Sequence, residues 1–598
     1  MYKKKLFILL FLFFNSFIFS QHNLKLRKQT EKELILLKNN ENIIPFLHLE
    51  TADIAVVSKV GAADFFGKTL QKYTTISDYY FDDLISNSSE KVALNKHAIV
   101  IYTITDPEDI VYLNEIRTTK KVIVVVFSED ILNVFLKNKT SYDVLVFAPN
   151  YKLISQEYAA QLLFGGIAAQ GKLQTDIVPN YKKGDGLKTQ QIRLKYTIPE
   201  EVGMNSEFIN QQVDSIMKLA IENNAFPGAQ LLVAKNNKVI FHKTYGFHTY
   251  DNIQEVQKND IYDLASVTKI TAPLPALMKL SEEGKIRLDK PFSTYWRSWK
   301  YKRNKKKLTL REILAHQAGL TPYIVFLAEV MKNGELKKRY IRNTKSKKFP
   351  IQAYENIYVS RRFERRMHKI IKRSKVSKIK KYKYSGLSFL IYPKLIFQLT
   401  KTPYQEYLQT EFYKPLGANT LGFIPKTKNF TNTIVPTEQD TIFRNTLTKG
   451  WVHDENAALL GGISGNAGLF SSANDLAKLM QMYVQKGTYG GKQYLKKSTF
   501  NEFTKVQYPK NENRRGLGFD KPLLNNSELD ITKSYPAPAV SKASFGHAGF
   551  TGTFVWADPE NELIFIFLSN RVYPTRKNRN LYKLNIRPAL QQVFYEAR

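Results

Sequence analysis

Four short hydrophobic runs in the first third of the chain predict a buried sheet. The runs occupy residues 53–57, 97–104, 121–127 and 143–148, and polar stretches long enough for helices separate them. Continuous runs rich in Val and Ile are typical of parallel strands that are buried on both faces. We therefore expect residues 22–185 to form an α/β sandwich with a parallel sheet, in which a helix over residues 24–37 comes first.

The hydrophobic pattern changes beyond residue 200. Apolar residues at a helical period predict an amphipathic helix over residues 206–223. Asn236-Asn237 lies between two strand-like runs and predicts a hairpin, and a second hairpin is expected over residues 552–569. Hairpins near both ends, with helices between them, favour an α+β domain over residues 201–598 that has an antiparallel sheet and a helical subdomain. Residues 186–200 are predicted to be the linker.

The N-terminus has the layout of a secretory signal. Lysines at positions 3–5 precede an apolar run over residues 6–19, and Ser20 offers a small residue for cleavage. The run is short for a transmembrane helix, which needs about 20 residues, although an uncleaved anchor remains the alternative. We expect a signal peptide over residues 1–20 and an exported protein, periplasmic or secreted.

The chain contains no cysteine. This excludes disulfides, a thiol nucleophile and cysteine-ligated metal sites. It also excludes a bacterial lipoprotein anchor, which needs a cysteine.

Charge is strongly positive and unevenly distributed. The formal net charge is +36, and residues 337–383 carry 19 Lys or Arg against two Glu. We expect an exposed helical segment there, which is either a solvated surface or a surface that attracts an anionic envelope polymer. Nucleic acid is not expected as a partner, because the protein is predicted to be exported and no nucleic-acid-binding motif occurs. The sequence does not indicate an oligomeric state.

Ser266-Val-Thr-Lys269 is the first candidate for chemistry. The pattern predicts the start of a helix, on which a hydroxyl and an amine three residues apart share one face. A serine becomes a nucleophile when a neighbouring base takes its proton, and a buried lysine can be that base. The same Ser-x-x-Lys spacing also begins at Ser88, Ser215 and Ser377, so the spacing alone does not identify a site.

Two downstream motifs distinguish Ser266 from the other three matches. They are Tyr384-Ser-Gly386 and His547-Ala-Gly549, the second immediately before the last hairpin. In this order the three motifs resemble those of the serine β-lactamase-like and penicillin-binding-protein-like hydrolases, in particular the class C β-lactamase and esterase branch. The resemblance covers residues 200–598 and extends to the stretches Pro227-Gly-Ala-Gln, Leu314-Ala-His-Gln-Ala-Gly-Leu, Tyr413-Lys-Pro-Leu-Gly and Gly468-Leu-Phe-Ser-Ser.

This resemblance implies a role for each motif. Ser266 would form an acyl-enzyme, and Lys269 would take or share its proton. Tyr384 would relay a proton, which requires a phenol that ionises more easily than usual beside cations such as Lys269. His547 takes the position of the lysine in the family's Lys-Thr-Gly motif, where it would supply a hydrogen bond.

Other positions follow from the same resemblance. Gly549 would let the strand approach the substrate, and the backbone N–H groups of Ser266 and Phe550 would form the oxyanion hole. Gly386 replaces the family's usual Asn or Asp, and Asn466 stands where related sequences often carry His. No cofactor or metal site is predicted, and His316 and His453 are interpreted as structural.

The first part of the chain resembles the C-terminal sandwich domain of glycoside hydrolase family 3. The residues that carry this resemblance are 33–45 and 163–173. In that family a catalytic barrel comes before the sandwich, and this chain has no such barrel. We therefore expect a remnant or docking module and no glycosidase activity.

Together these features predict an exported serine hydrolase that cleaves an ester or amide through an acyl-enzyme on Ser266. A peptidoglycan peptide is the favoured substrate, followed by a simple ester and then a β-lactam. The alternative is a catalytically weak or inactive protein that binds a cell-wall or envelope polymer.

Overall fold

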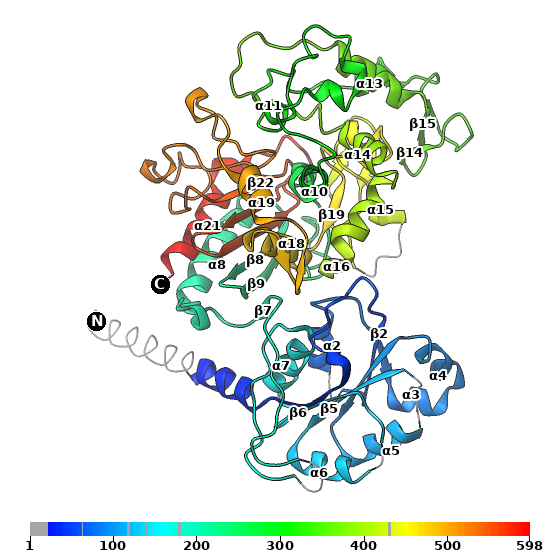
Figure 1. Ribbon diagram of the computed structural model, residues 1–598. Helices are drawn as coiled ribbons and strands as arrows, with labels where there is room; N and C mark the ends of the chain where they lie inside the picture. Colours follow the sequence, from blue (N-terminus) through cyan, green and yellow to red (C-terminus); the bar gives the residue numbers. More distant parts are fainter. Residues whose placement is uncertain are drawn as a thin grey trace. The chain divides into compact units, whose positions relative to one another are not determined.

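The computed structural model describes residues 22–61, 64–115, 120–138, 140–177, 181–427 and 432–597 (Figure 1). The chain divides into two compact units. The first runs to Glu207 and includes Lys414–Asn419 and Tyr489–Lys492, and the second holds Phe208–Tyr413, Thr420–Thr488 and Gln493–Arg598. The predicted signal peptide over residues 1–20 lies outside the described residues. Within the described ranges, no helix is both long and apolar enough to span a membrane.

The first unit is built on a six-stranded sheet with the order β1-β6-β5-β4-β2-β3. The four expected hydrophobic runs form β2, β4, β5 and β6, and these strands pair in parallel. The six strands are β1 (Ile35–Asn39), β2 (Ile54–Ser58), β3 (Ser77–Tyr80), β4 (Ile99–Ile104), β5 (Lys121–Phe127) and β6 (Val144–Ala148). The helices are α2 (Asp64–Leu70), α3 (Phe81–Ser86), α4 (Ser88–Leu94), α5 (Pro107–Glu115), α6 (Glu129–Lys137) and α7 (Leu153–Phe164).

The helix expected over residues 24–37 is wrong in its second half. Residues 22–33 are helical, but Ile35–Asn39 is the edge strand β1, which pairs antiparallel with β6. The run of Ile35, Leu36 and Leu37 is buried against the sheet. A short apolar run fits a helix or a strand equally well from its periodicity, and here tertiary burial decided between them.

Helices cover both faces of this sheet. On one face, strand residues such as Val57 and Val124 pack with Phe81 and Phe135 from the helices. On the other face, Phe127 meets the ring of Phe66 from α2 at 6.1 Å, and α7 packs on β6. Burial on both faces explains why the strands are uninterrupted apolar runs.

The second unit contains an antiparallel sheet in which β22, β23, β24, β8 and β9 are neighbours in this order. The strands are β8 (Gly228–Lys235), β9 (Lys238–Gly246), β22 (Phe545–Ala548), β23 (Phe554–Asp558) and β24 (Leu563–Ser569). Asn236 and Asn237 have φ angles of 49° and 61°, the left-handed pair that a tight hairpin turn requires. The pairing of β24 with β8 joins hairpins from opposite ends of the domain, as the hydrophobic pattern predicted.

Helices pack on both faces of this second sheet. The helix α18 packs on β8, β23 and β24 and is buried along its length. On α21, Phe594 packs against Phe241 of β9 and Phe565 of β24. The main helices of the unit are α8 (Ser206–Glu222), α9 (Thr268–Thr271), α10 (Pro273–Glu282), α11 (Leu310–Leu314), α12 (Leu327–Val330), α14 (Tyr392–Thr400), α15 (Tyr404–Leu408), α17 (Glu455–Ala458), α18 (Ala473–Val484), α19 (Lys497–Thr504), α20 (Asn580–Lys583) and α21 (Ile586–Glu596).

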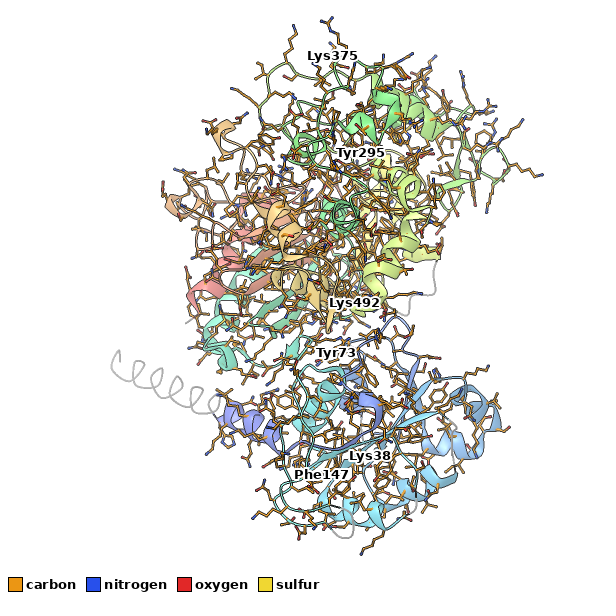
Figure 2. The ribbon with its side chains drawn as sticks, viewed as in Figure 1. Lys38, Tyr73, Phe147, Tyr295, Lys375 and Lys492 are labelled. Atoms are coloured by element: carbon orange, nitrogen blue, oxygen red, sulfur yellow. The ribbon has the colours of Figure 1, made fainter. Side chains whose placement is uncertain are left out.

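The expected helical segment over residues 337–383 is only partly helical. A three-stranded antiparallel sheet forms first, from β13 (Ile341–Arg342), β15 (Ile357–Val359) and β14 (Ile351–Tyr354), and α13 (Phe363–Arg373) follows it. Pro350 is unfavourable within a helix, and the buried positions on β15, Ile357 and Val359, recur at strand spacing. The basic side chains stay on the outside, and Lys375 extends into solvent at the end of the segment (Figure 2).

The helix α11 lies directly before the segment that leads to the candidate site. Its N-terminus is capped by two reciprocal hydrogen bonds between Thr309 and Glu312. The Thr309 hydroxyl accepts from Glu312 N at 3.1 Å, and the Glu312 carboxylate accepts from Thr309 N at 2.9 Å. These reciprocal bonds form a capping box, which satisfies two backbone donors of the first turn.

Further short strands of the unit are β10 (Tyr262–Asp263), β16 (Gly422–Phe423), β17 (Glu438–Asp440), β18 (Thr446–Thr448) and β19 (Leu469–Ser471).

Thr309→Ala should therefore lower the free energy of unfolding by about 1 kcal/mol, because it leaves the Glu312 N–H without its acceptor. Thr309→Ser keeps the hydroxyl and should lose less than half as much. Urea unfolding at neutral pH measures both variants. Equal losses in the two variants would contradict the capping role of the hydroxyl.

Candidate active site

Ser266 lies in a tight turn that is set by its neighbours. The expected helix starts as the 3₁₀ helix η3 (Ala265–Val267), which runs directly into α9. Ser266 therefore lies two residues before the first residue of the α-helix. Ala265 has a φ of 45°, a left-handed conformation that costs a non-glycine residue about 1–2 kcal/mol. The buried Asp263 carboxylate accepts from Ala265 N at 2.8 Å and from His453 N at 2.6 Å, and these bonds hold the turn. Burial raises the pKa of Asp263.

The helix that follows is cut short, because Pro273 cannot continue its hydrogen-bond pattern. It ends at Thr271, and α10 begins at Pro273. Lys269 therefore belongs to a single helical turn directly after Ser266.

Lys269 contacts only uncharged groups. Its Nζ donates to Ser266 Oγ at 2.9 Å and to the Asn466 carbonyl at 2.8 Å, and the side chain is 2% exposed. The same nitrogen lies 5.5 Å from the ring centres of both Tyr384 and Phe389. In the part of the chain that the structure describes, no carboxylate forms an ion pair with Lys269. The Lys269 amine is therefore held against the Ser266 hydroxyl, and its hydrogen-bond partners among the described residues are all uncharged.

Two of the other Ser-x-x-Lys matches lack this environment. Lys218 lies 3.8 Å from Glu222, and Lys380 lies 2.7 Å from Glu312. Both lysines are held as partners of carboxylates near the surface. Of the three matches compared, Ser266 is the one whose lysine is buried and has uncharged partners among the described residues.

The structure brings Tyr384 to the same hydroxyl. Its phenol donates to Ser266 Oγ at 3.3 Å, so Ser266 Oγ accepts from both Lys269 and Tyr384. The ring of His316 packs against Tyr384 at 4.6 Å, and His316 Nδ1 accepts from Ser385 N at 3.2 Å. Burial and nearby cations lower the pKa of His316 well below its usual value. The neutral His316 ring therefore packs beneath residues 384–386, which we call the tyrosine loop.

His547 is also neutral, and its two ring nitrogens have different roles. Nδ1 lies 2.8 Å from the Ala548 carbonyl, which can only accept, so Nδ1 carries the proton. Nε2 is then an acceptor, and it is buried with no hydrogen-bond partner among the described residues. Burial, followed by the charges of Arg515 and Lys269, lowers the pKa of His547 to about 3. The ring lies 6.0 Å from that of Tyr384.

Gly549 allows the strand end to approach the chain before Ser266. A Cβ at this position would lie 2.0 Å from Thr553 Oγ1 and 2.6 Å from the Leu264 carbonyl. The Thr551 hydroxyl donates to the Asp263 carbonyl at 2.7 Å, and the Thr553 hydroxyl donates to the Leu264 carbonyl at 3.0 Å. The turn over residues 549–553 is therefore fastened to the segment that carries Ser266.

The two expected oxyanion donors are available. Within the described ranges, the backbone N–H groups of Ser266 and Phe550 donate to no protein acceptor. The Phe550 carbonyl is held by Arg571, whose Nε lies 2.9 Å away, and the Phe550 ring is 43% exposed. Backbone donors that are fixed in place but unused are what a developing oxyanion needs.

Arg515 is a residue of the site that the sequence analysis missed. The side chain is 1% exposed, and its guanidinium lies 5.7 Å from the centre of the Tyr384 ring. It pairs with Asp520 at 3.0 Å and donates to the Gly518 carbonyl at 3.2 Å. The sequence predicted cations beside Tyr384 but named only Lys269 as an example. The one available signal was the pair Arg514-Arg515 before a glycine, which has no specific meaning by itself.

Two departures from the family pattern have different consequences. At Gly386, an added Cβ would meet no atom within 4 Å, so the missing side chain leaves open space beside Tyr384. Asn466 contributes its backbone carbonyl to Lys269, and its side chain bonds Ser464 Oγ at 2.7 Å and Asp454 at 3.0 Å. A contact made by a carbonyl does not depend on the identity of the side chain.

His453 belongs to an ion-pair network beside Phe550. Its Nε2 lies 2.8 Å from Glu438, and Arg576 Nε donates to the same carboxylate at 2.7 Å. Burial would raise the pKa of Glu438, but Arg576 and His453 outweigh it and hold the value at about 2. Across the described ranges, no cluster of three or more His, Asp or Glu side chains is arranged to hold a metal ion.

Comparison with known proteins places the second unit among characterised folds. A family model described as Beta-lactamase matches residues 209–587. A "Putative D-alanyl-D-alanine carboxypeptidase" from Salmonella enteritidis is 30% identical over 426 residues, which covers 65% of this chain and 90% of that protein. A penicillin-binding protein homologue from Caulobacter crescentus has a TM-score of 0.45 at 15% identity and covers 65% of this chain and 99% of its own. A class C β-lactamase from Rhodobacter sphaeroides has a TM-score of 0.45 at 15% identity, with coverage of 64% and 99%.

The lowered pKa of His547 predicts an acid-sensitive fold. The folded protein keeps this ring neutral down to a pKa of about 3, whereas the unfolded chain binds the proton near 6.5. The contribution to stability is therefore complete above pH 6.5 and is lost as the pH falls toward 3. Urea unfolding of the wild type and of His547→Gln at several pH values should show a smaller acid loss in the variant. Parallel pH dependences of the two proteins would contradict a buried neutral His547.

Proposed function

This chain belongs to the beta-lactamase family, and on that premise we propose that it is an exported serine hydrolase that forms an acyl-enzyme on Ser266. The observation that supports the proposal most directly is the convergence on Ser266 Oγ. Lys269 Nζ and the Tyr384 phenol both donate to it, at 2.9 and 3.3 Å. A hydroxyl held between an amine and a phenol has two proton carriers within reach.

The first half-reaction uses both carriers. For this step the Lys269 amine is unprotonated and turns its lone pair toward Ser266, and it takes the proton of Ser266 as Oγ attacks the carbonyl carbon of the substrate. The carbonyl oxygen becomes negative, and the backbone N–H groups of Ser266 and Phe550 stabilise it, an effect typically worth a few kcal/mol of barrier. Tyr384 gives its proton to the leaving amine or alcohol as the bond to the acyl carbon breaks, and it regains a proton from Lys269.

The second half-reaction releases the acid. A water molecule attacks the acyl carbon, the neutral Lys269 amine accepts its proton, and the same N–H groups hold the oxyanion again. Ser266 leaves with a proton, and a carboxylic acid departs. The Arg515 guanidinium lies 5.7 Å from the centre of the Tyr384 ring, so a positive charge stays beside the phenol throughout the reaction.

The substrate we propose is an ester or an amide, with a peptidoglycan peptide first. His547 Nε2 is a buried acceptor without a partner in the described residues, so it suits an amide N–H or a hydroxyl of the substrate. A lysine at this position could only donate. The open space at Gly386 admits a substrate group where the family usually carries a side chain. The name of the Salmonella enteritidis relative supports a D-alanyl peptide; a simple ester ranks next and a β-lactam third.

The remaining parts of the chain support an envelope location. We propose that residues 1–20 direct export to the periplasm or beyond, and that the first unit is a sandwich of the glycoside hydrolase family 3 type, without glycosidase activity. The basic side chains of residues 337–383 lie outside the small sheet and α13, so this segment is proposed to attract an anionic envelope polymer.

A catalytically weak or inactive polymer-binding protein is the second candidate. The observation in its favour is Gly386, which leaves the neighbourhood of Lys269 without the side chain that the family uses there. In this reading the pocket and the basic segment would retain wall polymer without turning it over.

Labelling with a fluorescent fluorophosphonate separates the two candidates. We expect the wild type to acquire one label, because the activated Ser266 hydroxyl attacks phosphorus and expels fluoride. Ser266→Ala should not be labelled. Ser215→Ala, which removes the serine of another Ser-x-x-Lys match, should be labelled at the wild-type rate.

An unlabelled wild type with native circular dichroism would contradict the hydrolase proposal. Retention on peptidoglycan by that same unlabelled protein would favour the binding protein. Label on Ser266 together with equal retention of wild type and Ser266→Ala would show that catalysis and polymer binding coexist.

A further inference from the structure

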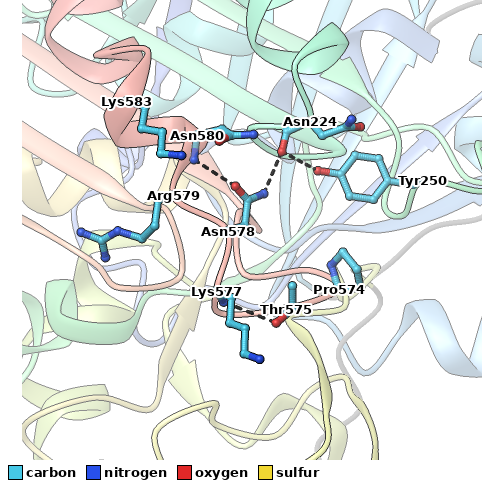
Figure 3. A pocket seen from close by; sticks show the side chains of 9 residues that line it. All are labelled: Asn224, Tyr250, Pro574, Thr575, Lys577, Asn578, Arg579, Asn580 and Lys583. Atoms are coloured by element: carbon cyan, nitrogen blue, oxygen red, sulfur yellow. Dashed lines mark hydrogen bonds between the residues drawn. The ribbon is translucent and has the colours of Figure 1, made fainter.

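In the pocket that follows β24, the cationic side chains point apart and the polar atoms bond one another. The pocket measures about 500 Å³, and the head groups of Lys577, Arg579 and Lys583 face different directions (Figure 3). Asn578 Nδ2 donates to the Asn224 carbonyl at 2.7 Å. Groups that converge on one point of the second unit are found instead at the tyrosine loop.

The tyrosine loop is fastened to the segment that follows α11. The Ser385 hydroxyl donates to the Thr321 carbonyl at 2.7 Å, and Gly386 N donates to the Pro322 carbonyl at 3.3 Å. These bonds hold the two residues that come directly after Tyr384. The position of the phenol therefore depends on the segment over residues 316–322.

His316, at the start of that segment, binds the neighbours of Tyr384 on both sides. Its backbone carbonyl accepts from Lys383 N at 2.9 Å, and its Nδ1 accepts from Ser385 N at 3.2 Å. Between these two bonds, the imidazole packs against the Tyr384 ring with 4.6 Å between the ring centres. One residue thus contacts three consecutive positions, 383–385, through its carbonyl, its ring nitrogen and its ring face.

The conformation and the ring of His316 are both unfavourable for stability. Its φ is 56°, a left-handed conformation that a residue with a Cβ rarely adopts. Because Nδ1 accepts a backbone N–H, the proton of the neutral ring lies on Nε2. Nε2 is buried and has no hydrogen-bond partner among the described residues, which leaves a donor unsatisfied. Backbone strain of this kind tends to collect at functional sites.

The two groups that reach the Ser266 hydroxyl are held by different parts of the chain. Lys269 Nζ lies 2.9 Å from Ser266 Oγ and is also held by the Asn466 carbonyl at 2.8 Å. The Tyr384 phenol lies 3.3 Å from the same oxygen, near the limit of a hydrogen bond, so a small shift of the tyrosine loop would break this contact. Loss of the His316 ring should therefore displace Tyr384 and leave Lys269 in place.

We propose that His316 is a positioning residue, which holds the Tyr384 phenol where the leaving group departs. The inference rests on the proposed function, in which Tyr384 gives its proton to the leaving oxygen or nitrogen as the bond to the acyl carbon breaks, and regains a proton from Lys269. A simple alkoxide or an amine anion cannot depart at neutral pH without that proton, whereas 4-nitrophenolate is stable as an anion. His316 is therefore needed for unactivated esters and amides and dispensable for activated esters.

Two esters of butyric acid test this role in the full chain. Ethyl butyrate and 4-nitrophenyl butyrate give the same acyl-enzyme, so they differ only in the leaving group. His316→Gly removes the ring, keeps the backbone carbonyl and suits the left-handed φ. In this variant kcat/KM should fall at least about tenfold for the ethyl ester and at most about twofold for the 4-nitrophenyl ester.

Tyr384→Phe should show the same dependence on the leaving group, with a loss of about 100-fold for the ethyl ester. Adding His316→Gly to Tyr384→Phe should cause no further loss, because the two residues act as a unit.

Two further variants separate positioning from general damage. His368→Ala removes another buried histidine, whose ring packs on Trp296 at 5.2 Å, and it should change kcat/KM for both esters by the same factor. His316→Asn offers an oxygen near the place of Nδ1 and adopts a left-handed φ readily, so it should recover most of the activity on the ethyl ester. If His316→Gly loses its native circular dichroism, His316→Gln replaces it, because the longer amide reaches past Ser385 N.

Equal losses for the two esters in His316→Gly would overturn the proposal, and so would additive losses in the double variant. A wild type that cleaves the 4-nitrophenyl ester but not the ethyl ester would overturn it as well. Fluoride departs without a proton, so fluorophosphonate should label His316→Gly at the wild-type rate. An unlabelled wild type would contradict the hydrolase proposal itself, whereas a labelled wild type with equal ester losses in His316→Gly would contradict only the role of His316.

Discussion

The buried amine of Lys269 is the interaction on which the site depends. An amine removed from water without hydrogen bonds is unfavourable, so it must be given partners. Its partners are Ser266 Oγ and the Asn466 carbonyl, with the rings of Tyr384 and Phe389 beside it. These groups come from segments far apart in the sequence. One buried nitrogen therefore ties the turn at Ser266 to the glycine-rich turn at 466 and to the tyrosine loop.

The antiparallel sheet of the second unit positions the other segment of the candidate site, the turn that follows β22. The strand β22 ends at Ala548, and the turn after it approaches Leu264 closely because Gly549 has no side chain. Hydroxyls of Thr551 and Thr553 then bond the carbonyls just before Ser266. This arrangement keeps the N–H groups of Ser266 and Phe550 on neighbouring, immobilised segments. The strained φ of Ala265 persists because Asp263 and the surrounding bonds hold that turn.

The sequence allowed the site residues to be predicted but not all of their states. Ser266, Lys269 and Tyr384 could be grouped because their motifs occur in a distinctive order, and the structure brings them together around one oxygen. The neutral, accepting Nε2 of His547 could not be foreseen, because it results from burial and from the Ala548 carbonyl. Arg515 was missed for a related reason, since its contact with Tyr384 exists only in the folded chain.

Some elements of the fold could likewise be predicted from the sequence, and others could not. The parallel strands of the first unit and both hairpins of the second were predictable from local patterns, since burial on both faces and paired asparagines leave clear signals. The strand Ile35–Asn39 and the small sheet within residues 337–383 were not. In the first case a short apolar run fitted either structure. In the second case the density of charge hid the short alternation on β15, and β14 has no alternation of buried positions.

The rate at which Ser266 is labelled in Lys269→Met tests the central claim most directly. This variant keeps a long side chain in the buried site but removes the amine that bonds Ser266 Oγ. If Lys269 is the base, the fluorophosphonate labelling rate should fall at least about 100-fold while circular dichroism stays native, in line with the usual contribution of a positioned base. A labelling rate within about twofold of the wild type would contradict the assignment of Lys269 as the group that activates Ser266.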